Sequence, residues 1–114
     1  MKIGTFEDII SWQKSQDLAK TIYELFRNNR DYGFKDQIQR AVVSISNNIA
    51  EGFERKGNNE FKQFLFIAKG SCAEVRSMSN LALSSEYISQ KDFEEIHAKA
   101  VEISKLISGL IKTL

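Results

Sequence analysis

Residues 34–56 read FKDQIQRAVVSISNNIAEGFERK, and the spacing of their apolar side chains decides the fold class. Ile38, Val42, Ile45, Ile49 and Phe53 follow one another at intervals of three or four residues, which places them on one side of an α-helix. The same stretch contains Ser, Asn and Gly, which are poor residues for a helix interior. Because local propensity does not favour a helix here, packing of the apolar seam against neighbouring segments must stabilise it.

The rest of the chain repeats this helical pattern. We expect four helices, at about residues 5–29, 34–56, 60–86 and 90–114. Thr5 with Asp8, and Ser89 with Asp92, have the spacing of a capping box at the start of the first and last helices. From Phe93 to the end of the chain, apolar residues alternate between spacings of three and four, as in an a/d seam. Proline is absent, so long uninterrupted helices are possible.

These helices predict an all-α protein, with the four helices packed as an antiparallel up-down-up-down bundle. A chain of 114 residues has the size of one domain, so we expect a single bundle over residues 1–114. Cys72 is the only cysteine and cannot form an internal disulfide, which favours a reducing compartment such as the cytoplasm. No segment approaches the ~18 apolar residues of a membrane span, and residues 1–7 contain no apolar export signal.

The predicted helix 60–86 carries a second apolar face on the side opposite Leu65 and Cys72. Its small residues would let another backbone approach closely, and helix 34–56 has a weaker counterpart. We therefore predict self-association through this face; the alternative is scattered surface apolar residues, which are normal. The predicted interface comprises Val43, Ala50, Phe66, Gly70, Ala73, Ser77 and Leu81.

Motifs of catalysis and metal binding are absent from the sequence. With one histidine and one cysteine, a single chain cannot build a His/Cys metal cluster. The sequence also lacks a glycine-rich phosphate loop, a G-x-S-x-G motif and an H-E-x-x-H motif. His97 flanks the seam of the last helix and is expected to be a surface or boundary residue. We therefore predict no enzymatic activity, no catalytic residue, no cofactor and no metal.

Charge gives little indication of a nucleic-acid partner. Sixteen Lys and Arg against fifteen Asp and Glu give a net charge of +1, whereas nucleic-acid domains usually have a pI above ~9. A polar stripe beside the seam comprises Gln37, Arg40, Ser44, Asn48, Glu51 and Arg55. We expect these side chains to hydrogen-bond within the bundle, Arg40 with Ser44 and Glu51 with Arg55. The alternative is a basic surface for RNA or DNA phosphates, weakened by nearby glutamates. That surface would comprise Arg40, Arg55, Lys56, Lys62, Lys69 and Arg76.

Three segments resemble a known family. They are FEDIISWQK from residue 6, QIQRAVVSISNNIAEGFER over 37–55, and FLFIAKGSCAE over 64–74. Together they are similar to the bacterial four helix bundle protein family, also called the 23S rRNA intervening-sequence protein family, some members of which are encoded inside insertions in 23S rRNA genes. The resemblance implies a ring-shaped homopentamer of up-down bundles with no established enzymatic activity.

The same segments are also similar to the accessory protein of diversity-generating retroelements. That protein is a pentameric barrel of this fold, and it binds a reverse transcriptase and nucleic acid. The resemblance therefore implies further copies of this chain as the first partner, with RNA, DNA or another protein as the alternative.

Overall fold

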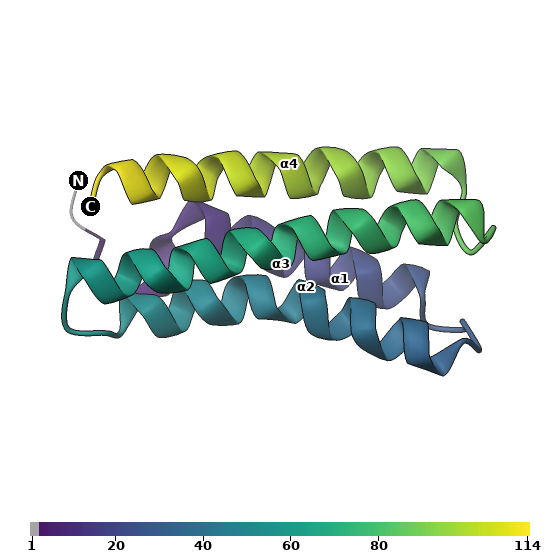
Figure 1. Cartoon of the computed structure of the whole chain (residues 1–114), viewed down its shortest axis with the longest axis horizontal. Helices are drawn as coiled ribbons and strands as arrows, with labels where there is room; N and C mark the ends of the chain where they lie inside the picture. Colours follow the sequence, from purple (N-terminus) through teal and green to yellow (C-terminus); the bar gives the residue numbers. More distant parts are fainter. Residues whose placement is uncertain (1–2) are drawn as a thin grey trace.

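The computed structural model describes residues 3–114, so the first two residues of the predicted domain 1–114 lie outside it. A single 3-10 turn, η1, spans Phe6–Asp8 and precedes the long helices. The described α-helices are α1 (Ile10–Leu25), α2 (Tyr32–Phe53), α3 (Asn58–Ser84) and α4 (Gln90–Lys112). They lie along the long axis of a molecule measuring 43 × 22 × 19 Å, and each runs opposite to the one before it (Figure 1). The predicted up-down-up-down four-helix bundle is confirmed.

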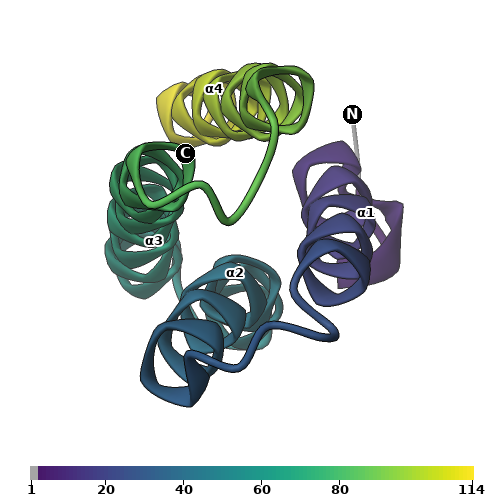
Figure 2. The same ribbon diagram turned by 90° about the vertical axis from the view of Figure 1, so that its right-hand side faces the viewer.

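The four helices surround the core in the order of the sequence, and α4 closes the bundle against α1. Seen end-on, they occupy the corners of a square (Figure 2). Each helix contacts the two helices beside it: α1 with α2, α2 with α3, α3 with α4, and α4 with α1. Every helix therefore has an inner face, an outer face and two flanks, and each flank borders a different neighbour.

The predicted apolar seams meet in the centre of this square. Ile38, Val42, Ile45 and Ile49 of α2 are fully buried. The other fully buried apolar side chains include Leu18, Ile22, Leu65, Val75, Ile96, Ile103 and Ile107, contributed by α1, α3 and α4. Cys72 lies among them, and burial raises the pKa of its thiol to about 12. The thiol is therefore protonated at neutral pH and is not a nucleophile.

The first helix is shorter than the expected 5–29, because the helical conformation is interrupted at Ile9. Thr5 makes no capping hydrogen bond through its side chain, and Ile9 has extended backbone angles between η1 and α1. In a continuous helix, Ile9 would point away from Leu18, since nine residues correspond to two and a half turns. The break instead buries Ile9 in the core. Helix α1 also ends early, at Leu25, and the following Phe26 is buried.

Side-chain caps mark the starts of two helices. The Asp31 carboxylate accepts a hydrogen bond from the Phe34 backbone N–H at 3.1 Å, so α2 begins at Tyr32. Ser89 Oγ accepts one from the Asp92 backbone N–H at 3.1 Å, as the spacing of these residues predicted for the last helix. Such caps satisfy backbone donors that have no partner within the helix. In the described residues, none of these helices has the length and apolar character that a membrane span requires.

One hydrogen bond joins the turn before α2 to the turn between α3 and α4. Tyr87 donates its hydroxyl to Asp31 Oδ2 at 2.6 Å, and the Tyr87 ring also packs edge-on against Phe34. The bond from Tyr87, and then the bond from the Phe34 N–H, lower the pKa of the Asp31 carboxyl. The same bond raises the pKa of the Tyr87 hydroxyl.

We expect Tyr87→Phe to lower the melting temperature at pH 7 and to have a smaller effect in acid. The pKa of the Asp31 carboxyl is lower in the folded protein than in the unfolded chain, where it is about 3.9. The ionised carboxylate therefore stabilises the fold fully above about pH 3.9, and this stabilisation is lost as the pH falls through the pKa of the folded protein. Thermal unfolding followed by circular dichroism from pH 7 to pH 2 measures this. Tyr32→Phe is the matched control, because Tyr32 is 69% exposed. The prediction is contradicted if Tyr87→Phe lowers the melting temperature by the same amount at pH 2 as at pH 7.

Candidate functional site

The predicted polar stripe of α2 forms a hydrogen-bonded seam with α3. Ser71 donates its hydroxyl to Ser44 Oγ at 2.9 Å, which links the two helices. Asn48 donates to the Ser44 hydroxyl and carbonyl at 2.9 and 2.8 Å. The expected ion pair between Glu51 and Arg55 is present at 3.0 Å. Of these contacts, only the bond from Ser71 to Ser44 joins α2 to α3, and the others lie along α2 itself.

Gly52 lies in the same seam, at a close approach between α2 and α3. A Cβ atom at this position would lie 2.6 Å from Phe64 Cβ and 3.1 Å from Phe61 Cδ1. Real Cβ atoms do not come that close to other carbon atoms, so only glycine fits without a shift of the helices. Gly52 is therefore required for packing.

The outer face of α3 exposes the apolar residues that the sequence assigned to an interface. Phe66 is 58% and Leu81 is 54% exposed, and the smaller residues between them are exposed as well. At Gly70, an added Cβ would meet no heavy atom within 4 Å. We call this surface the α3 outer face; it comprises Phe66, Gly70, Ala73, Ser77 and Leu81. Ile67, which lies beside this face on α3, is 52% exposed and widens it.

The two α2 residues of the predicted interface lie elsewhere. Val43 and Ala50 are half-buried, and they are three residues before and four after Ser46, so all three share one flank of α2. Ser46 accepts a hydrogen bond from Gln16 of α1 at 2.9 Å, which places this flank beside α1. Val43 and Ala50 are therefore separated from the α3 outer face, and the predicted set divides into two surfaces.

The six residues predicted to contact phosphates do not form one surface: three of them lie apart, and three lie together on α3. Arg40 bonds Asp36 at 2.8 Å, instead of the expected Ser44. Arg55 pairs with Glu51 and lies over the Phe64 ring, 4.9 Å from its centroid. Lys56 lines a hollow at the end of the bundle where the α2–α3 turn meets the last residues of α4. The structure brings together only the remaining three, Lys62, Lys69 and Arg76, which are half-buried and follow one another at intervals of seven residues along α3.

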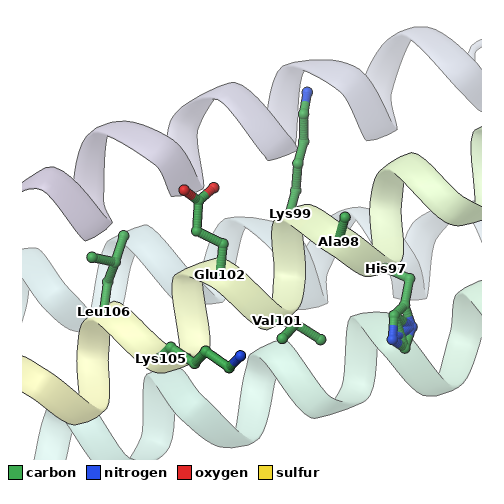
Figure 3. A pocket seen from close by; sticks show the side chains of 7 residues that line it. All are labelled: His97, Ala98, Lys99, Val101, Glu102, Lys105 and Leu106. Carbon is green, nitrogen blue, oxygen red and sulfur yellow. The ribbon is translucent and has the colours of Figure 1, made fainter.

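An open hollow runs along α4 (Figure 3). Its lining residues are His97, Ala98, Lys99, Val101, Glu102, Lys105 and Leu106, all of them on α4. Lys99 and Glu102 point towards α1, where Lys99 reaches Thr21 at 3.4 Å and Glu102 reaches Lys14 at 3.4 Å. His97, Val101 and Lys105 lie on the flank towards α3. Since one helix supplies every lining residue, the hollow is a surface feature and not an enclosed cavity.

Side chains suited to bind a metal do not gather at one place in the described part of the chain. Within residues 3–114, no group of three or more His, Cys, Asp or Glu residues is placed to hold a metal ion. The surfaces that stand out are therefore the α3 outer face and the row of cations beside it. Both are suited to binding other molecules.

Comparison with known proteins gives two findings. Residues 7–109 match the family described as 23S rRNA-intervening sequence protein. The fold is similar to the crystal structure of a protein of unknown function from the S23 ribosomal protein family of Bacteroides thetaiotaomicron VPI-5482. That similarity has a TM-score of 0.84 and 28% sequence identity, and covers 90% of this chain and 99% of the other. No curated protein matches the chain. Neither finding indicates an enzymatic family.

Proposed function

Since the chain belongs to the 23S rRNA-intervening sequence protein family, we propose that it is a non-enzymatic four-helix bundle that assembles with further copies of itself. It acts by binding, without a cofactor or metal. The observation that carries this proposal is the α3 outer face, where Phe66 and Leu81 are both more than half exposed. Burying such a side chain contributes about 1.5–3 kcal/mol, which favours a partner that covers both.

The arrangement of the apolar surfaces supports a ring. The α3 outer face and the Val43 and Ala50 flank of α2 lie on different sides of the bundle. A contact between two different faces is head-to-tail, and such contacts close into rings when the rotation permits. The resemblance to pentameric relatives makes five the proposed number of subunits. A free, buried Cys72 is consistent with a cytoplasmic location.

Light scattering at micromolar concentration tests self-association. We expect a mass about five times the 13.0 kDa of one chain. A mass of 13.0 kDa would overturn the proposal as a whole. A dimer, trimer or hexamer would support self-association and overturn only the number five.

RNA or DNA is the second candidate partner, and one specific observation favours it. Lys62, Lys69 and Arg76 form a row on a single flank of α3, whereas Arg40 and Arg55 are already paired with acidic residues of α2. In this proposal, the protein is an adaptor that brings nucleic acid to a larger assembly.

A further inference from the structure

We propose that the groove between α3 and α4 binds the sugar–phosphate backbone of a nucleic acid strand. We call this surface, where the flanks of the two helices adjoin, the α3–α4 groove; its cationic side chains are Lys62, Lys69 and Arg76 from α3 and Lys105 from α4, and His97 of α4 lies beside them. The inference gives the second candidate partner a defined site, and it does not depend on self-association.

The row on α3 borders α4. Ser71 marks the opposite flank, because its hydroxyl bonds Ser44 of α2. Lys69 and Arg76 lie three residues before and four after Cys72, and helical geometry turns them away from the Ser71 flank. Helix α3 contacts only α2 and α4 among the described helices, so this flank faces α4. At about 1.5 Å per residue, the row from Lys62 to Arg76 is about 21 Å long.

The α4 side of the groove also carries positive charge. Figure 3 shows His97 and Lys105 on the flank towards α3, while Lys99 and Glu102 extend to the other neighbour. The acidic Glu102 is engaged there with Lys14 of α1 at 3.4 Å, and Glu95 pairs with Lys99 at 3.2 Å. These two carboxylates are thus directed away from the groove. Glu94, three residues before His97, shares the His97 flank of α4 and accepts a hydrogen bond from Gln90 at 2.9 Å, so one carboxylate remains beside the groove.

The cations of the groove are free to meet an external anion. Within the described residues, the four ion pairs involve other lysines and arginines: Lys14, Arg40, Arg55 and Lys99. Of the fifteen acidic side chains, four are engaged in these ion pairs on other flanks, which leaves the cations of the groove without a paired carboxylate although the net charge is only +1. Clustered positive charge of one sign attracts polyanions even when the whole protein is near neutral.

Two buried nitrogen atoms on the facing helices lack hydrogen-bond partners. They are Arg76 Nε and His97 Nδ1, neither of which has a partner in the described structure. A buried polar group without a partner is unfavourable. Phosphate oxygens are acceptors that suit the planar guanidinium of arginine, and an imidazole N–H can donate to the same oxygens. Rotation of the Arg76 and His97 side chains towards a bound phosphate would therefore supply the acceptors that they lack in the isolated bundle.

The composition of the groove indicates recognition of the backbone and not of the bases. Four of its side chains are cationic, Phe93 of α4 is half-buried and packs against the His97 ring at 5.8 Å, and the exposed Phe66 of α3 belongs to the α3 outer face. Contacts to phosphates fix position and carry no sequence information. We therefore expect binding that is independent of sequence and sensitive to salt.

The test is fluorescence anisotropy with labelled 20-nucleotide probes: single-stranded RNA, single-stranded DNA and duplex DNA. Salt is varied from about 50 to 200 mM to obtain the salt slope, which is the fall in the logarithm of the binding constant per unit of the logarithm of the salt concentration. Each phosphate contact contributes about 0.7 to this slope for single strands and about 0.9 for duplex. We expect Lys62→Ala/Lys69→Ala/Arg76→Ala to weaken binding and to lower the slope by about 2–3. The three probes distinguish which type of strand the groove accepts.

The control variant Lys20→Ala/Arg40→Ala/Lys91→Ala removes the same charge from exposed positions on α1, α2 and α4, and should leave the slope unchanged. The double variant Lys62→Ala/Lys69→Ala avoids any effect of Arg76 on packing, and should lower the slope by about 1.4–1.8.

Three results would overturn the proposal. The first is no binding of any probe at low salt, and the second is an equal loss in the control variant. The third is a groove variant that changes the light-scattering mass while retaining nucleic-acid affinity, because a second copy of the chain would then occupy the groove. Failure of self-association alone, seen as a monomer that still binds the probes, leaves this inference standing.

Discussion

Gly70→Glu should convert the assembly into monomers of 13.0 kDa while the helix content stays the same. Gly70 lies at the centre of the α3 outer face, between the exposed Phe66 and Leu81. In the isolated bundle, the new side chain meets no obstacle, because a Cβ at this position has no heavy atom within 4 Å. Glutamate is also the better helix former, by roughly 0.5 kcal/mol or more. The folded monomer should therefore tolerate the change.

The assembly should not tolerate it. If the α3 outer face is covered by another subunit, the introduced carboxylate would be a charge without a partner inside an apolar contact. The effective cost of burying such a charge is several kcal/mol, and it recurs at every interface of a ring. Loss of about 3 kcal/mol per interface weakens each contact more than a hundredfold, since 1.4 kcal/mol corresponds to a factor of ten.

Light scattering measures the mass of the assembly, and circular dichroism on the same samples measures the helix content. Gly109→Glu is the matched control: Gly109 is exposed on α4, and a Cβ there also meets nothing within 4 Å. The control should keep the mass of the wild type. If Gly70→Glu keeps it too, the α3 outer face is not the interface.

Gly52→Ala should have the largest effect on stability. The new methyl group would lie 2.6 Å from Phe64 Cβ, an atom that no side-chain rotation can move away. Helices α2 and α3 must therefore separate, which strains the seam containing the bond from Ser71 to Ser44. Overpacking of this kind costs about 1–3 kcal/mol, and the better helix propensity of alanine offsets only about 1 kcal/mol of a larger cost. We expect a net loss of up to about 2 kcal/mol.

Urea denaturation measures the loss, with Gly109→Ala as the control that should stabilise the protein slightly. Assembly makes apparent stability depend on protein concentration, so all variants are compared at one concentration and again in the Gly70→Glu background. Equal stability of Gly52→Ala and Gly109→Ala would show that α2 and α3 do not approach as closely as described.

The apolar periodicity was sufficient to predict the core. The spacing of Ile38, Val42, Ile45 and Ile49 depends only on helix geometry, and all four are fully buried. The start of α4 was predictable as well, because the Ser89 cap is a local interaction. The start of α1 was not: the spacing of Thr5 and Asp8 suggested a cap, but burial of Ile9 outweighs that local signal.

Other features depend on which neighbour each flank meets. Gly52 and Gly70 are both glycines within long helices, yet one touches Phe64 and the other nothing. Spacing places Gly70 on the outer face of its helix and Gly52 near the apolar seam, but only the packing of α2 against α3 shows that Phe64 leaves no room for a Cβ at Gly52. Among the six cations, Arg40 and Arg55 pair with acidic residues of their own helix, whereas the neighbour that Lys62, Lys69 and Arg76 face is known only from the order of the helices around the core (Figure 2).

The sequence by itself determined the fold class, the inner face of each helix and the existence of an unused apolar face on α3. These follow from residue spacing, since an α-helix turns each residue by a fixed angle. Only the tertiary structure decided that Val43 and Ala50 border α1, that the row of Lys62, Lys69 and Arg76 borders α4, and that Gly52 lies at a close contact between α2 and α3. The physical reason is that the contacts of a helix flank depend on which helix lies beside it, and the packing of the bundle determines which helices are neighbours.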